Sequence, residues 1–320
     1  MNKFLIKENE LILVVGSTGQ DGTLLCQSLM RKGKAVIGTS RNKATDKADW
    51  PIFKLNYLDR SMVESFLNAH SFTEIYFLGA QSSVGKSFDE PHDTFYSNTI
   101  PILNVLDWIK NNSPQTKFFH ASSGEIFGSR KTGANELSNY HPLSPYAVSK
   151  LAATELVKNY RMAYGLFAVN GILFNHESYL RDERFVTGKI VNSAIRIKLK
   201  LQDKLYLGNI EIERDWGSAE DYVEAMQLMM KSNINDDFII ATGKKTSLKC
   251  FCDLVFAELG MNSLDFIVAD NENFRPLDLK TSFGDPDKIY RQLNWKAKIT
   301  IEELISNWVG KALAKNNKKI

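Results

Sequence analysis

Residues 11–22 read LILVVGSTGQDG, and their pattern indicates the fold class. Its first five residues are an uninterrupted apolar run, which predicts a buried parallel strand, and residues 21–31 follow with apolar side chains at helical spacing. Gly16, Gly19 and Gly22 lie between the two. They permit a tight reversal, a close approach of the backbone to a pyrophosphate and close packing of the helix on the sheet. The helix N-terminus adds N–H groups and a partial positive charge, so the stretch predicts the start of a dinucleotide-binding domain.

The first half of the chain repeats this alternation of strand and helix. Further strands are expected at residues 35–39, 52–55, 75–78 and 118–120, and helices at residues 61–68 and 102–109. The alternation predicts an α/β fold, a Rossmann-type doubly wound parallel sheet with right-handed crossovers. Beyond about residue 175 the pattern is mixed, which predicts a smaller mixed α/β substrate-binding lobe. We expect a dinucleotide-binding domain at 1–175 with a return segment near 212–243, and a lobe made of 176–211 and 244–320.

The composition excludes several classes of protein. The 320 residues carry 40 Lys and Arg against 37 Asp and Glu, and this net charge of +3 argues against nucleic acid or an anionic membrane as a partner. No apolar run approaches the ~18 residues of a membrane span. Cys26, Cys250 and Cys252 are too few for a disulfide framework and fit a reducing cytoplasm, where we expect the protein. The spacing of Cys250 and Cys252 is wrong for a usual zinc site and the five histidines do not cluster, so no metal is expected.

The end of the second predicted strand bears on the choice of dinucleotide. The sequence there is GTSRNK at residues 38–43, which contains Arg41 but no acidic residue. An NAD site usually has a carboxylate at this place for the ribose 2′-hydroxyl, whereas a guanidinium can bind a 2′-phosphate through two hydrogen bonds. The pattern favours NADP over NAD, and the alternative is that Arg41 is an ordinary surface arginine.

Four further residues form a candidate catalytic set. Tyr146 and Lys150 lie four residues apart in SPYAVSK, on one face of a predicted helix. A phenol with a pKa of about 10 is a poor base at neutral pH, and a lysine cation one turn away would stabilise its phenolate. Ser123 can hydrogen-bond a substrate hydroxyl or the tyrosine, and Glu125, also just beyond a predicted strand, can abstract a proton next to a carbonyl. Alone, these patterns also fit a surface helix and a strand-end turn.

Longer motifs make the chain resemble the GDP-mannose 4,6-dehydratase group of the extended short-chain dehydrogenase/reductase family, over nearly its whole length. The most specific are GSTGQDG (16–22), LGAQSSV (78–84), SPYAVSK (144–150), NGILFNHES (170–178), FVT (185–187), LYLGN (205–209), RDWG (214–217), FRP (274–276) and GDP (284–286). The resemblance implies a lyase that converts GDP-mannose to a 4-keto-6-deoxy sugar nucleotide. Hydride would leave C4 for NADP and return to C6 after loss of water, with Tyr146 taking the 4-hydroxyl proton and Glu125 the C5 proton.

The resemblance also assigns residues to each part of the site. Its catalytic positions are Ser123, Glu125, Tyr146 and Lys150. The residues that it places around NADP are Gly16, Ser17, Thr18, Gly19, Gln20, Asp21, Gly22, Arg41, Asn56, Tyr57, Leu78, Gly79, Ala80, Gln81, Ser82, Tyr146, Lys150, His176 and Arg181. The residues that it places around the GDP-sugar are Ser83, Ser123, Asn175, Val186, Lys189, Arg214, Arg275 and Asp278.

Several departures from the family pattern keep alternatives open. Gly124 stands where the family usually has a hydroxyl, so protonation of the leaving 6-hydroxyl would need Glu125 itself or water. Tyr179-Leu180 replaces a Pro–Arg pair, and Gly188 replaces an arginine. The alternatives are a GDP-sugar 4-reductase or 4-dehydrogenase, or a 4,6-dehydratase that acts on another GDP-hexose or a GDP-heptose. A non-catalytic NADP-binding protein is a more remote alternative.

The largest departure concerns the loop after Arg41. Only residues 42–51 separate Arg41 from the third predicted strand, whereas the family typically has a longer, arginine-containing loop that reaches a neighbouring subunit's cofactor. The resemblance therefore implies a homo-oligomer in which a dimer is favoured over a tetramer. That dimer would form through two helices per subunit, one of which carries Tyr146 and Lys150.

Overall fold

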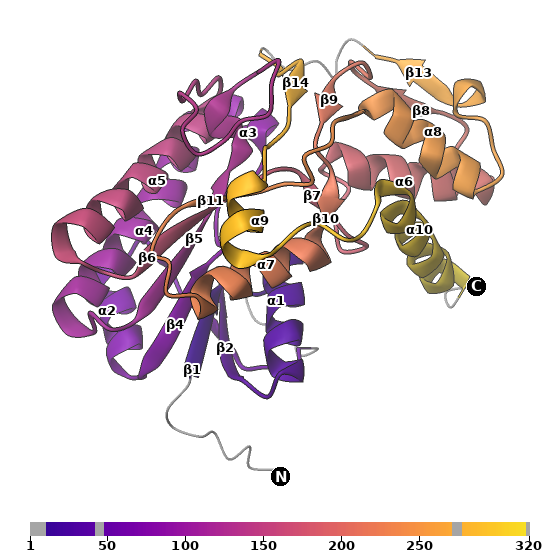
Figure 1. The fold of residues 1–320 in the computed structure, drawn as a ribbon. Coiled ribbons are helices and arrows are strands. Elements are labelled where there is room, and N and C mark those ends of the chain that lie inside the picture. Colours follow the sequence, from indigo (N-terminus) through magenta and orange to yellow (C-terminus); the bar gives the residue numbers. More distant parts are fainter. Residues whose placement is uncertain (1–10, 42–47, 271–276, 318–320) are drawn as a thin grey trace. The chain divides into compact units, whose positions relative to one another are not determined.

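A computed structural model describes residues 11–41, 48–270 and 277–317 of the chain (Figure 1). Within these ranges a seven-stranded sheet consists of β1 (Leu11–Val15), β2 (Ala35–Ser40), β3 (Ile52–Lys54), β4 (Phe72–Phe77), β5 (Lys117–Ser123), β6 (Ala168–Leu173) and β11 (Phe238–Ile240). The strand order is β11-β6-β5-β4-β1-β2-β3, and the neighbouring pairs from β6 to β3 are parallel. This order confirms the predicted doubly wound fold, in which ligands bind at the switch point between β1 and β4.

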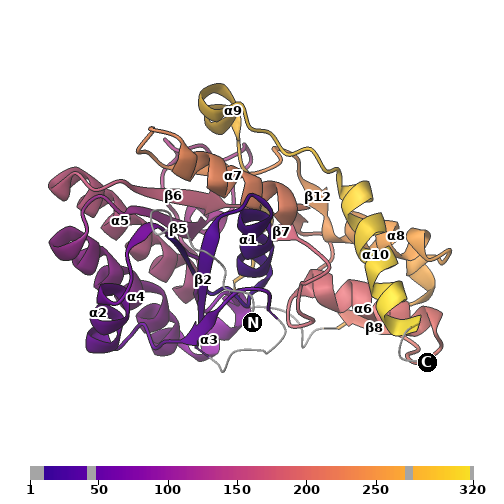
Figure 2. The ribbon, with the colours of Figure 1, turned by 90° about the horizontal axis from the view of Figure 1, so that it is seen from below.

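Helices cover both faces of this sheet (Figures 1 and 2). They are α1 (Gln20–Arg31), α2 (Arg60–Asn68), α3 (Val84–Asp89), α4 (Pro91–Asn112), α5 (Pro145–Tyr164) and α7 (Ala219–Lys231), with a 3-10 turn η1 (Gly124–Phe127) after β5. α2, α4 and α5 enclose one apolar core with alternate strand residues such as Leu13 and Phe77. Burial of each large apolar side chain contributes about 1.5–3 kcal/mol. α1 lies on the opposite face, where Gln227 of α7 donates to Ser28 and accepts a hydrogen bond from Lys32.

The described chain divides into two compact units. Unit 1 comprises Met1–Ile126, Ser144–Leu173 and Val223–Phe238, and unit 2 comprises Phe127–Leu143, Phe174–Tyr222 and Ile239–Ile320. The sequence-based division places residues 127–143 in the first domain, whereas the structure groups them with unit 2. The reason is long-range pairing, because Ala134 forms a β-bridge with Gly284 and the Ile239 amide donates to the Glu136 carboxylate.

Unit 2 has its own apolar core around Trp216, Phe251 and Trp308. Its helices are α6 (Val186–Lys198), α8 (Leu248–Glu258), α9 (Asp287–Leu293) and α10 (Ile301–Asn317), with a 3-10 turn η2 (Ser263–Asp265). Its short strands are β7 (His176–Glu177), β8 (Leu205–Leu207), β9 (Glu213–Arg214), β10 (Gly217–Ser218), β12 (Thr246–Ser247), β13 (Ile267–Ala269) and β14 (Thr281–Ser282). They pair as β10-β7, β12-β9-β14 and β13-β8.

The strands predicted from the sequence correspond to β1 to β5, β6 and β11 are not among them, and one helix is predicted too short. The predicted helix at 102–109 is the C-terminal part of α4, which begins at Pro91 and continues through the buried Pro101. A proline inside a helix removes one backbone hydrogen bond, so the local pattern suggested a boundary there. Burial of Thr94, Asn98 and Ile102 on the sheet side favours the continuous helix.

Two features are absent from residues 11–41, 48–270 and 277–317. No helix in these ranges is long and apolar enough to cross a membrane. Among the same residues, no group of three or more His, Cys, Asp and Glu side chains is placed to hold a metal ion.

Candidate active site

The glycine-rich turn lies between β1 and α1, at the switch point of the sheet. Gly16 has φ +81°, and a Cβ on it would lie 2.9 Å from the Gly79 nitrogen in the loop after β4. A Cβ on Gly22 would overlap the Gly16 carbonyl oxygen. The amides of Gly16 and Ser17 donate to the Thr39 oxygen in β2 over 3.0 and 3.1 Å. The turn is thus fixed against β2 and β4, and two of its glycines have no room for a side chain.

The N-terminal end of α1 suits a phosphate. Gly19 precedes the helix in an extended conformation, and none of the described side chains caps this end. The aligned peptide dipoles therefore present partial positive charge to the turn. The Thr18 hydroxyl hydrogen-bonds the Ser40 hydroxyl over 3.3 Å, which brings the turn beside the end of β2. The exposed Arg41 follows Ser40 directly, so its guanidinium is attached next to the candidate phosphate site.

Asn56 and Tyr57, after β3, have different environments. The Tyr57 side chain is buried, its hydroxyl is 2.9 Å from the Thr39 hydroxyl, and its ring packs edge-on against Phe77. Burial raises its pKa, so the phenol stays neutral. Asn56 is exposed, and its Oδ1 accepts a hydrogen bond from the Leu58 amide over 3.2 Å. Tyr57 is therefore a buried support beneath β2, whereas Asn56 is accessible to a ligand.

Asn98 of α4 holds the loop after β4, and sequence reasoning missed it. Its Oδ1 accepts from the Gln81 amide over 2.8 Å, and its Nδ2 donates to the Gln81 oxygen and to Ser149 Oγ over 3.1 and 2.9 Å. Ser149 Oγ in turn donates to the Tyr146 oxygen over 2.7 Å. One buried amide thus joins the loop after β4 to the first turn of α5. Asn98 lies one turn before Ile102, outside the predicted helix at 102–109, so no sequence pattern indicated its role.

The remaining residues of this loop lie at the carboxyl end of β4. The Gln81 amide group donates to the Ser83 oxygen over 2.9 Å and to Thr94 Oγ1 over 3.0 Å. The Ser83 hydroxyl caps α3 by accepting from the Lys86 amide over 3.2 Å. The predicted cofactor residues that stay partly or fully exposed in this loop are Leu78, Gly79, Ala80, Gln81 and Ser82.

α5 supplies Tyr146 and Lys150 from its buried face. Ser144 caps the helix by accepting from the Ala147 amide over 3.0 Å. The Lys150 side chain is 5% exposed, and its Nζ donates to the Ala121 oxygen of β5 over 2.7 Å. Burial lowers the pKa of Lys150 to about 8, because a charged ammonium is disfavoured away from water. An anion beside it would restore the preference for the charged form.

Ser123 and Glu125 meet this helix at the end of β5. Ser123 is the last residue of the strand, two positions after Ala121, and its Oγ accepts from the Glu125 amide over 3.3 Å. η1 turns the chain at once, which keeps Glu125 next to the strand end. The structure therefore places the four predicted catalytic residues in unit 1, at the carboxyl end of β5. In the sheet, β5 is the direct neighbour of β4, whose loop meets the glycine-rich turn.

A layer of buried polar side chains fixes α5 on the sheet, and sequence reasoning missed it as well. His120 Nδ1 lies 2.8 Å from Asn170 Oδ1, and burial followed by the nearby Lys150 charge lowers the His120 pKa to about 3. The imidazole is therefore neutral, and its Nδ1–H donates to Asn170. The hydroxyls of Ser122 and Thr154 are 2.6 Å apart, and Asn170 Nδ2 donates to the Thr154 oxygen over 3.2 Å. These bonds join β5, β6 and α5 beside Lys150.

Unit 2 contains the predicted cofactor residues His176 and Arg181. His176 Nδ1 is 2.7 Å from the Phe174 oxygen, and its ring stacks on Tyr222 with centroids 4.6 Å apart. Arg181 Nε donates to the Glu177 carboxylate over 2.6 Å, and its Nη2 donates to the His176 oxygen. Both side chains are thus held by contacts close to β7.

The predicted GDP-sugar residues also lie in unit 2. Asn175 precedes β7, and its oxygen accepts from the Gly217 amide over 2.9 Å. Val186 begins α6, and Lys189, one turn further on, donates from Nζ to the Tyr206 oxygen over 2.7 Å.

Arg214 and Asp278 are paired with each other. Arg214 is 4% exposed and donates to Asp278 Oδ1 over 2.9 Å and to the Leu279 oxygen over 2.7 Å. This pairing connects β9 to the segment before β14. Arg275 lies outside the described residues.

Solved structures share the fold of this chain. Among solved structures, the chain is similar to the UDP-glucose 4-epimerase of Thermus thermophilus in complex with NAD, with a TM-score of 0.84, 24% identity and coverage of 94% of this chain and 98% of that one. It is also similar to RMD from Pseudomonas aeruginosa complexed with NADPH, with a TM-score of 0.81, 22% identity and coverage of 96% and 99%. With these neighbours it shares the fold of the extended short-chain dehydrogenases/reductases.

The sequence matches are more specific. The family model described as GDP-mannose 4,6 dehydratase matches residues 13–308. The chain is 39% identical over 329 residues to "GDP-mannose 4,6 dehydratase 1" of Arabidopsis thaliana, which covers 97% of this chain and 91% of that protein. The chain belongs to the GDP-mannose 4,6-dehydratase family.

Proposed function

We propose that this protein is a hydro-lyase that converts GDP-mannose to GDP-4-keto-6-deoxymannose. The observation that carries the proposal is the hydrogen bond from Lys150 to Ala121, which holds the Tyr146–Lys150 face of α5 at the end of β5. Ser123 and Glu125 follow within one turn at that end. Membership of the family supports the same reaction and substrate.

A nicotinamide dinucleotide fits the glycine-rich turn, because Thr18 and Gly19 are exposed and Gly19 presents no side chain at the N-terminal end of α1. When bound, it supplies a hydride acceptor that later returns the hydride. Arg41 supports NADP over NAD, since its guanidinium would pair with the 2′-phosphate. Titration of both dinucleotides tests this choice. NADP should bind more tightly to the parent protein, and Arg41→Ala should lose most of that preference. An unchanged preference in Arg41→Ala would exclude Arg41 as the determinant.

The catalytic residues would act in sequence on the sugar. Tyr146, as a phenolate stabilised by the Lys150 ammonium, takes the proton of the 4-hydroxyl as C4 is oxidised and becomes a neutral phenol. Burial lowers the pKa of Lys150 to about 8, and the neighbouring phenolate favours its charged form. Ser123 donates a hydrogen bond at the same position. The 4-ketone acidifies the C5 proton, which Glu125 removes while water leaves from C6. The hydride then returns to C6, so the sum is loss of one water without net oxidation.

Because of Gly124, we propose a second candidate function, that of a GDP-sugar 4-dehydrogenase. Glycine has no proton to give to the leaving 6-hydroxyl, so that proton would come from Glu125 or from water. Incubation with GDP-mannose and mass spectrometry of the product separates the two functions. Loss of the mass of water supports dehydration, loss of two hydrogens supports oxidation alone, and an unchanged mass excludes GDP-mannose as substrate. Glu125→Gln should keep C4 oxidation and lose elimination, and elimination at the parent rate would exclude Glu125 as the base.

The GDP moiety would be bound from unit 2. The residues that we propose for it are Asn175, Val186, Lys189, Arg214, Arg275 and Asp278, and Ser83 and Ser123 would contact the sugar. The backbone atoms that hold Lys189 and Arg214 keep these two cations oriented. Because a diphosphate needs several fixed cations, each alanine variant of Lys189 or Arg275 should raise KM more than it lowers kcat.

We also propose a dimer formed through α4 and α5 rather than a tetramer. These helices carry the exposed apolar side chains Phe95, Tyr96 and Val148, which are 43%, 57% and 45% accessible. Light scattering coupled to size exclusion would measure the mass, and Tyr96→Glu should yield monomers. The free Cys26, Cys250 and Cys252 support the cytoplasmic location proposed from the composition.

A further inference from the structure

Residues 178–185, which connect β7 to α6 and are called the 178–185 loop below, lie directly on the first turn of α6. A Cβ on Gly188 would overlap the Asp182 oxygen and would lie 3.1 Å from the Arg181 oxygen. The loop backbone therefore occupies the space of a side chain at this position. A glycine at 188 is a requirement of the loop's path and not a neutral replacement.

A second contact holds the middle of the loop. Arg181 pairs with the Glu177 carboxylate over 2.6 Å, and its guanidinium lies 4.8 Å from the centroid of the Phe185 ring. Glu177 is 4% exposed and belongs to β7, which pairs with β10. The arginine thus connects the strand before the loop to the residue that precedes α6.

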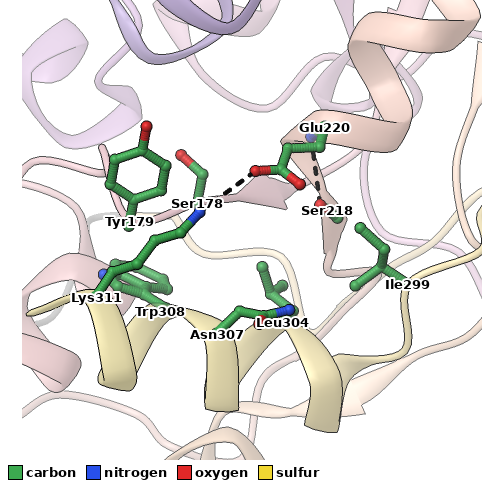
Figure 3. Close-up of a pocket in the computed structure, with 9 residues that line it drawn as sticks. All are labelled: Ser178, Tyr179, Ser218, Glu220, Ile299, Leu304, Asn307, Trp308 and Lys311. Carbon is green, nitrogen blue, oxygen red and sulfur yellow. Dashed lines mark hydrogen bonds and ion pairs between the residues drawn. The ribbon is translucent and has the colours of Figure 1, made fainter.

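A third contact joins α10 to the start of the loop (Figure 3). The Nζ of Lys311 lies 4.1 Å from the centroid of the Tyr179 ring and 3.7 Å from Glu220 Oε1. The side chain crosses one end of a pocket lined by Ser178, Tyr179, Ser218, Glu220, Ile299, Leu304, Asn307, Trp308 and Lys311. The ion pair is long and half-exposed, so this contact is weaker than the other two and can open.

We propose that Lys311 and Tyr179 form a latch through which α10 sets the position of the 178–185 loop and thereby the affinity for the sugar nucleotide. The link to affinity rests on the function proposed above. The loop ends at Phe185, whose oxygen accepts from the Lys189 amide over 2.9 Å in the first turn of α6. A shift of the loop therefore moves the turn that carries Val186 and Lys189. Lys311 is a positioning residue, since it acts on that turn through Tyr179.

Hydrogen exchange of the full-length protein tests the latch without any substrate. The informative amides are those of Leu180 and Arg181, which donate to Ser178 Oγ and to the Ser178 oxygen over 3.2 and 3.0 Å. Lys311→Met and Tyr179→Ala should raise their exchange rates about threefold or more, because both variants remove the cation–ring contact. Lys311→Arg and Tyr179→Phe should keep parent rates. Lys249→Met, which removes another exposed ion pair of unit 2, is the matched control.

Steady-state kinetics with GDP-mannose tests the link to affinity. Lys311→Met should raise KM about three- to tenfold and leave kcat within about twofold, with parent values restored by Lys311→Arg. Unchanged exchange in Lys311→Met would overturn the latch, and raised exchange with an unchanged KM would overturn its effect on binding. If the parent protein does not turn over GDP-mannose, the proposed function fails. Comparison of hydrogen exchange in the parent and in Lys311→Met, with and without GDP, still decides whether the latch controls the loop.

Discussion

Replacement of Lys150 by methionine should stabilise the folded protein while it removes activity. Lys150 is 5% exposed, and burial lowers its pKa from 10.5 to about 8. This difference of 2.5 pH units (10.5 − 8) means that burial disfavours the ammonium by about 3 kcal/mol at neutral pH. Methionine avoids that penalty but loses the hydrogen bond to the Ala121 oxygen, which contributes about 2 kcal/mol. We therefore expect a net stabilisation of about 1 kcal/mol at pH 7.

The stability difference between Lys150→Met and the parent should depend on pH. Because the pKa of Lys150 is lower in the folded state, the unfolded chain binds more protons between about pH 8 and pH 10.5, and the parent gains stability as the pH rises through this window. The methionine variant lacks this gain. Its advantage should be largest below pH 8 and should shrink above it by about 1.4 kcal/mol per pH unit. An advantage of about 1 kcal/mol is therefore lost at about pH 8.7, and at higher pH the parent should be the more stable, because its neutral amine keeps the hydrogen bond to Ala121 without the burial penalty.

Urea unfolding followed by circular dichroism at pH 7, 8.5 and 10 measures this difference directly. Lys249→Met removes an exposed lysine paired with Asp253 over 2.8 Å and should show little difference from the parent at each pH. Turnover by Lys150→Met should fall at least about 100-fold, because the Tyr146 phenolate loses its neighbouring cation. A variant that is less stable than the parent at pH 7, by a margin that does not change with pH, would refute the reasoning about Lys150.

Three further substitutions test the packing of the site. Gly16→Ala should raise the Kd of NADP at least about tenfold, because φ is +81° and a Cβ would press on the loop after β4, whereas Gly33→Ala, with φ +73° and open space around it, should leave that Kd unchanged. Asn98→Ala removes three hydrogen bonds of a buried amide and should lower the unfolding free energy by about 2–4 kcal/mol in urea titrations; a loss below about 1 kcal/mol would show that water replaces it. Gly188→Ala should displace the 178–185 loop and raise KM for GDP-mannose with kcat retained, and parent kinetics would contradict that path of the loop.

The first five strands of the sheet were predictable from local patterns, whereas β6 and β11 were not among the predicted strands. The apolar run at 11–15 and its glycine-rich turn fix the first βα unit, and the repeated alternation then permits few arrangements. Residues 127–143 were not predictable in this way. Their placement depends on pairing of Ala134 with Gly284 and of Glu136 with Ile239, more than 100 positions away in the chain. No local pattern contains such a pairing.

The reacting groups of the candidate site were predictable from the sequence. The buried side chains that hold those groups in place were not. Tyr146 and Lys150 stand out because a phenol and an amine one helical turn apart have a known chemical use. Asn98 and His120 do not stand out, because an isolated amide or imidazole in an apolar pattern acquires a role only from the partner that satisfies it once both are buried.

Whether a charged side chain is available to a ligand also depends on the tertiary structure. RDWG in the sequence suggests an arginine that is available to a diphosphate, but the structure pairs Arg214 with Asp278 and buries Asp215. Burial raises the pKa of Asp215 to about 6, although its carboxylate accepts from Thr242 and Gly243. A sequence gives the sign of each charge, whereas the burial and pairing that decide whether the charge can bind a ligand follow from the tertiary structure. The motif therefore anchors the loops of unit 2 through Asp215, and Arg214 can serve a nucleotide only in the orientation that Asp278 and Leu279 give it.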